Sequence, residues 1–180
     1  MTSYLALVVA AGLMVAPVRA ESRSPTEYEV KAAFIYNFAR YIQWPKGSDA
    51  NKPFVIGVIG KDPFGFALDD AVRGQTVQGR PVAVTRFERI DDIINCDILF
   101  VCSSESGHLQ QIFLTLRKAP VLTIGDMNEF AELGGMINLI NENNRIRFEI
   151  NPQAIGRVGL KAGSQVLRLA KIVNETRLDR

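Results

Sequence analysis

Residues 24–45 read SPTEYEVKAAFIYNFARYIQWP and predict an amphipathic helix with a marked start and end. Ser24 is a favourable N-cap residue, Pro25 suits the first helical position, and Glu27 completes a capping box. Pro45 cannot continue a helix and pushes the residue before it towards extended backbone. We therefore expect a helix that begins after Ser24 and ends before Pro45.

One face of this predicted helix is unusually aromatic. At about 100° per residue, its apolar positions are Val30, Ala33, Phe34, Phe38 and Tyr41, with Trp44 at the edge. Asn37 falls inside the same face, and a buried amide must find hydrogen-bond partners. We expect Phe34, Phe38 and Trp44 to pack in the core, and Asn37 to bond the backbone of a neighbouring segment.

Residues 1–20 have the features of a secretory signal peptide. The apolar run at 5–15 is too short to span a bilayer comfortably, and Val18 and Ala20 suit the small positions of a signal-peptidase site. We expect cleavage after Ala20, export, and one domain over residues 21–180. A retained membrane anchor is the alternative.

The charge balance argues against two classes of partner. The chain carries 21 Lys and Arg against 19 Asp and Glu, a net charge of +2, without a basic run. Such a surface gives no reason to expect binding to nucleic acid or to an anionic membrane.

Apolar runs alternate with helical patterns over most of the chain. Strands are predicted at residues 54–60, 82–87, 97–101 and 120–124, with helices at 66–72, within 103–116 and between 126 and 135. Residues 136–139 and 145–150 predict a hairpin, Asn151-Pro152 predicts a helix start, and 164–173 predicts a closing helix with Leu169 on its apolar side. The fold class is therefore α/β, a single-domain layered sandwich in which helices flank a mostly parallel sheet with an antiparallel C-terminal hairpin.

Familiar catalytic and cofactor motifs are missing from the sequence. The glycines at 57, 60 and 65 do not form a dinucleotide-binding pattern, and no serine lies in G-x-S-x-G. His108 is the only histidine, so a metal-ligand set with recognisable spacing is lacking. We expect no enzymatic activity, no metal and no cofactor.

Two places carry ligand-site hypotheses. Lys161, Gly163 and Ser164 lie at the start of the closing helix, where free N–H groups favour an anion, although Ser164 acting only as a cap is the alternative. The second site follows from the fold, because ligands bind beyond the carboxyl ends of parallel strands. That rule would bring together Asp62, Phe64, Ser103 and Ser104.

The two cysteines flank a predicted buried strand. A strand running from Cys96 to Cys102 would separate them by roughly 20 Å, whereas a disulfide requires Cα atoms within about 7 Å. Although export to an oxidising compartment favours disulfides, we expect two buried, reduced thiols.

Several segments, taken in order, resemble the YfiR family of periplasmic proteins. The opening is residues 27–38, EYEVKAAFIYNF, followed by Trp44-Pro45. Later matches are IGVIG at 56–60, DPFG at 62–65, CDILF at 96–100, LTI at 122–124, Phe130 with GGMIN at 134–138, RFEIN at 147–151, GLK at 159–161 and LRLA at 167–170. The resemblance extends over nearly the whole chain after residue 20.

The resemblance implies a periplasmic regulator. Family members repress a membrane-bound diguanylate cyclase by binding its periplasmic sensor domain, which lowers cyclic di-GMP and biofilm formation, and they tend to form dimers. A homodimer is therefore expected. Other relatives accompany sensor kinases, so a small-molecule-binding sensor subunit for a system such as a histidine kinase is the alternative. Better-known members carry disulfides, and the two cysteines here put redox control in doubt.

Overall fold

The computed structural model describes residues 24–45 and 51–174, and the expected signal peptide at 1–20 lies outside them. Its helices are α1 (Glu27–Tyr41), α2 (Ala67–Val72), α3 (Leu109–Leu116), α4 (Pro152–Arg157) and α5 (Ser164–Leu169), with 3₁₀ helices η1 (Ile90–Asn95) and η2 (Ser103–His108). Its strands are β1 (Ile42–Gln43), β2 (Phe54–Ile59), β3 (Thr76–Val77), β4 (Arg80–Phe87), β5 (Ile98–Val101), β6 (Leu122–Gly125), β7 (Ile137–Glu142), β8 (Arg145–Ile150), β9 (Lys161–Ala162) and β10 (Lys171–Ile172).

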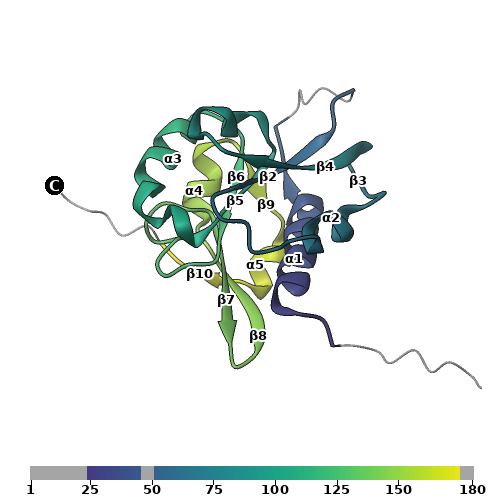
Figure 1. The fold of residues 1–180 in the computed structure, drawn as a ribbon. Coiled ribbons are helices and arrows are strands. Elements are labelled where there is room, and N and C mark those ends of the chain that lie inside the picture. Colours follow the sequence, from purple (N-terminus) through teal and green to yellow (C-terminus); the bar gives the residue numbers. More distant parts are fainter. Residues whose placement is uncertain (1–23, 46–50, 175–180) are drawn as a thin grey trace, which may run out of the picture.

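Eight of these strands form one curled, mostly parallel sheet (Figure 1) in the order β10-β8-β7-β6-β5-β2-β4-β3. Strands β4, β2, β5, β6 and β7 run parallel, in the order 2-1-3-4-5 of a doubly wound sheet. Strands β7 and β8 form the antiparallel hairpin, whose turn residues Asn143 and Asn144 both have positive φ. The predicted fold class is confirmed.

The sheet has a hydrophobic core on each face. Alternation along β5 sends Ile98 and Phe100 towards α1, α2 and α5, and Leu99 and Val101 towards η1 and α3. Such a strand is buried on both sides, which is why its sequence is apolar throughout.

Helix α1 begins later in the chain than predicted and turns a different face towards the core. Thr26 is the N-cap, because its hydroxyl accepts from the Glu29 amide at 3.3 Å and the Glu29 carboxylate accepts from the Thr26 amide at 2.6 Å. Its buried residues are Lys31, Ala32, Ile35, Phe38 and Ala39. Asn37 is exposed, so its predicted place in the core is wrong. Asn37 follows the buried Ile35 by two positions, which is about 200° around the helix axis, so it faces solvent.

Two other predicted helices differ. Residues 128–134 form turns instead of the predicted helix, since Glu129 has a φ of 58°, which a right-handed helix cannot contain. The closing helix ends at Leu169, which is 74% exposed, and the chain then forms β10. Because β10 pairs with β8 in parallel, the hairpin is not the edge of the sheet as predicted.

Candidate functional site

The carboxyl ends of β2 and β5 meet at the point where the strand order reverses. The Lys61 amide donates to the Ser104 hydroxyl at 2.9 Å, which joins the loops that follow these two strands. Gly60 has a φ of 96°, and a Cβ there would lie 2.5 Å from that hydroxyl oxygen. Ser104 therefore packs closely on Gly60 and joins the two loops at the edge where a doubly wound sheet can hold a ligand.

The four residues predicted at this edge have different environments. Asp62 and Ser104 belong to the joined loops, and Ser103 is exposed. Phe64 is buried and makes edge-to-face contacts with Tyr28 and Phe100, at centroid distances of 5.3 and 4.8 Å. Its role in the structure is to anchor the loop in the core.

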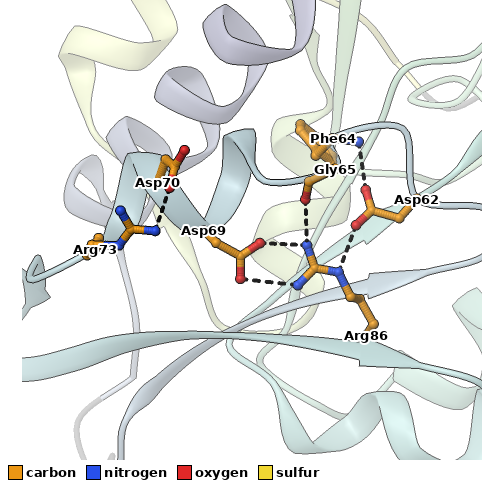
Figure 2. A network of polar contacts seen from close by, with 7 residues as sticks. All are labelled: Asp62, Phe64, Gly65, Asp69, Asp70, Arg73 and Arg86. Carbon is orange, nitrogen blue, oxygen red and sulfur yellow. Dashed lines mark hydrogen bonds and ion pairs between the residues drawn. The ribbon is translucent and has the colours of Figure 1, made fainter.

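Arg86, which the sequence analysis missed, organises the surface of this region (Figure 2). Its guanidinium donates to Asp62 at 2.8 Å, to Asp69 at 2.6 and 3.2 Å, and to the Gly65 carbonyl at 3.0 Å. These contacts lower the pKa of Asp69 and raise that of Arg86. They fix the loop between β2 and α2 against β4, beside Phe66, whose side chain is 83% exposed.

Lys31 forms a second polar cluster, inside the molecule. Its ammonium lies 2.8 Å from the Asp126 carboxylate and 2.6 Å from Glu27, and Tyr28 donates to Asp126 at 3.1 Å. Burial alone would lower the pKa of Lys31, but its hydrogen bonds to Asp126 and Glu27 outweigh burial and raise it. The cluster ties α1 to the loop that follows β6.

The predicted anion site has one of its donors already occupied. The Gly163 amide donates to the Tyr41 carbonyl at 3.2 Å, where a short antiparallel ladder pairs β1 with β9. Gly163, not Ser164, is the N-cap of α5, and Lys161 is exposed. Since α5 has only six residues, its N-terminus is a weak anion site.

The cysteines lie at opposite ends of β5, and both are buried with free thiols. Burial raises the pKa of the Cys102 thiol to about 12 and raises that of Cys96 as well. Neither thiol is therefore ionised at neutral pH.

An apolar groove of about 240 Å³ lies between α1, β8 and α5 and was not predicted. Its lining includes Phe34, Phe38, Phe148, Val166 and Leu169. Phe38 is buried and packs edge-to-face on Phe148 at 5.0 Å, whereas Phe34 is half-buried. The groove could not be predicted from the sequence, because an exposed leucine such as Leu169 cannot be distinguished there from a core leucine.

Neither a cluster of metal ligands nor a helix able to cross a membrane is found among the described residues. Among residues 24–45 and 51–174, no three His, Cys, Asp or Glu side chains gather closely enough to hold a metal ion. In the same part of the chain, every helix is too short or too polar to cross a bilayer.

The chain matches a protein-family model and is similar in structure to several solved proteins. The model, described as DUF4154, YfiR/HmsC-like, matches residues 28–171. A conserved domain protein from Vibrio cholerae O1 biovar El Tor is 11% identical with a TM-score of 0.56, over 83% of this chain and 60% of that one. The ABC domain in complex with L-Trp from Streptococcus pneumonia is also 11% identical, with a TM-score of 0.50, over 66% of this chain and 54% of that one. Both structures show the fold alone, and this chain matches less than two thirds of the length of either.

Proposed function

Because the chain belongs to the YfiR/HmsC-like family, whose members are periplasmic regulators of diguanylate cyclases, we propose that it represses an inner-membrane diguanylate cyclase by binding its periplasmic sensor domain. In this proposal residues 1–20 are removed on export, and the mature protein acts in the periplasm as a non-catalytic homodimer. The family match over residues 28–171 carries the proposal.

Repression of this kind requires only a difference in affinity. The regulator must bind the inactive state of its target more tightly than the active state, and about 5.5 kcal/mol of difference moves a two-state enzyme from almost fully active to almost fully silent. A protein surface of standard size can supply that energy when it has a few well-placed apolar or aromatic anchors.

The described surface supports such a contact at two separate places. Phe66 is 83% exposed on the loop that Arg86 fixes, and Leu169 is 74% exposed at the rim of the apolar groove. Burying one such side chain at an interface contributes roughly 1.5–3 kcal/mol. Each place is therefore able to anchor a protein partner.

A genetic experiment tests the proposed function. Deleting the gene should raise cyclic di-GMP and thicken biofilm, and deleting the cyclase as well should abolish both effects. Pull-down from solubilised inner membrane with the mature protein should recover the cyclase. Unchanged cyclic di-GMP across several growth conditions, with no cyclase recovered, would refute the proposal.

Small-molecule sensing is a second candidate, favoured by one observation. A groove of about 470 Å³, lined by Leu109, Phe113, Leu114, Leu133 and Arg157 among others, lies between α3, the 128–134 turns and α4. This volume falls within the usual range for ligand sites. A metabolite screen that raises the melting temperature of the purified protein would support this function, and the groove variant Phe113→Ala should remove the effect.

A further inference from the structure

The outer edge of β4 is only partly covered. Strand β3 pairs with β4 at Arg80 and Pro81 alone, and the Val82 amide then donates to the Gln75 carbonyl at 3.0 Å. Within residues 24–45 and 51–174, no strand pairs with this edge beyond that point. On its other side β4 is fully paired with β2, from Val82 to Phe87.

The bond from Val82 also shows which backbone groups face outward. In a parallel ladder, alternate residues direct both their N–H and C=O groups to the same neighbour. Since the Val82 amide points away from β2, the backbone groups of Val84 and Arg86 point the same way. Within the part of the chain that the structure describes, these donors and acceptors have no backbone partner, so they form a short row that is a template for another extended chain.

The usual protection of such an edge is weak here. A charged side chain guards an edge strand when it stands free in water, but the guanidinium of Arg86 is held against Asp62, Asp69 and Gly65 (Figure 2). Nearby, Arg73 pairs with Asp70 at 2.6 Å. Since Arg86 faces two carboxylates, Asp62 and Asp69, this surface keeps one negative charge in excess and disfavours an acidic partner segment.

Phe66 is an exposed aromatic residue that directly follows Gly65, a contact of Arg86 from the edge strand. The residue two positions before it, Phe64, is held in the core, and the Gly65 carbonyl accepts from Arg86 at 3.0 Å. The backbone that carries the Phe66 ring is therefore ordered before any partner binds. Such preorganisation reduces the entropy lost on binding, and exposed aromatic residues are frequent hot spots of interfaces.

We propose that the sensor domain of the cyclase adds an extended segment to the outer edge of β4, over residues 82–86, and packs an apolar side chain on Phe66. This inference rests on the proposed function for the identity of the partner. The recognised chemistry is a polypeptide backbone in extended conformation with an apolar side chain that can pack on Phe66. Donors and acceptors that recur at every second residue match such a strand.

Three variants test the proposal with the purified periplasmic domain of the cyclase as the probe. Val84→Pro removes an outward N–H and leaves the ladder to β2 complete, a change that edge strands tolerate. Val84→Ala is its matched control, because it shortens the same side chain and keeps the N–H. We expect Val84→Pro and Phe66→Ala each to weaken binding by roughly 30-fold or more, and Val84→Ala to weaken it by less than about threefold.

Hydrogen exchange gives a readout that needs no variant. The amides of Val84 and Arg86 should exchange quickly in the free protein and slowly in the complex. If these amides remain unprotected in the complex, strand addition is wrong and the proposed function stands. The same conclusion follows if Val84→Pro and Phe66→Ala bind like the wild type while Leu169→Asp at the groove abolishes binding. If the wild-type protein does not bind the domain at all, the proposed function fails and this inference with it.

Discussion

The ammonium of Lys31 lies 2.8 Å from the carboxylate of Asp126, 95 residues further along the chain, and only 5% of each side chain is exposed. A buried charge without its partner is costly, because the interior cannot solvate it as water does. This ion pair therefore makes the packing of α1 on the sheet dependent on two residues that no local pattern connects.

Replacing Lys31 tests the importance of this pair. Lys31→Ala leaves the buried Asp126 carboxylate without its counter-charge, so we expect the free energy of unfolding to fall by roughly 3–5 kcal/mol. Denaturant titration measures the loss. The control is Arg73→Ala, which breaks the exposed Arg73–Asp70 pair and should cost no more than about 1 kcal/mol. Equal losses in the two variants would contradict the structural role given to Lys31.

The orientation of α1 can be tested with its aromatic residues. Phe38 is 2% exposed, so Phe38→Ala should lower the free energy of unfolding by roughly 3–5 kcal/mol through lost burial and a cavity. Phe34 is half-buried beside the groove, and Phe34→Ala should cost less. Asn37→Ala, on the exposed face, should change stability by no more than about 0.5 kcal/mol. A large loss in Asn37→Ala would instead favour the orientation inferred from the sequence.

Glu149 makes stability depend on pH. Burial favours the neutral acid, but hydrogen bonds from Lys171 and Asn138 outweigh it and lower the pKa of Glu149 below its ordinary value of 4.5. A lowered pKa in the folded state means that the stabilisation is present above 4.5 and is lost as the pH falls through the folded-state pKa.

The free energy of unfolding should therefore fall in acid, and Glu149→Gln should make that decline shallower. Glu88→Gln, an exposed position, is the control and should follow the wild type. Equilibrium unfolding between pH 7 and about pH 3 measures both. An unchanged acid slope in Glu149→Gln would show that this carboxylate does not stabilise the pairing of β10 with β8.

The two thiols should be unreactive in the native protein. Because burial raises the pKa of Cys102 to about 12, almost none of this thiol is present as reactive thiolate at neutral pH. Alkylation by iodoacetamide should label neither cysteine until denaturant is added, and should then label both. Mass spectrometry of unreduced protein would contradict the structure if it found a bridge between Cys96 and Cys102.

Some elements could be predicted because their signals are local. The central strands β2 and β5 are continuous apolar runs, which is the composition demanded by burial on both faces. Asn151 followed by Pro152 specifies the start of α4 within two residues, since the Asn151 side chain accepts from the Ala154 amide at 3.0 Å. Neighbouring residues alone determine such features.

The start of α1 needed more than its own sequence. Ser24 with Glu27 and Thr26 with Glu29 both have capping-box spacing, and local chemistry does not choose between them. In the folded protein the Glu27 carboxylate binds Lys31 and accepts from Asn141, 114 residues away. Glu29 is therefore the acid whose carboxylate accepts a hydrogen bond from the amide of the N-cap residue Thr26.

The candidate site also combines features that could be predicted from the sequence with features that depend on the tertiary structure. The rule for parallel sheets correctly brought the loops that carry Asp62 and Ser104 together, because it depends only on the alternation of strands and helices. The clamp by Arg86 depends on β4 lying beside β2, and the open edge depends on β3 being only two residues long.

By itself the sequence determined which segments are buried and where several helices begin and end, since apolar runs and caps act over a few residues. Only the tertiary structure decided which charges meet, which aromatic residues stay in solvent and which strand edge remains open, because these depend on groups that are distant in the chain.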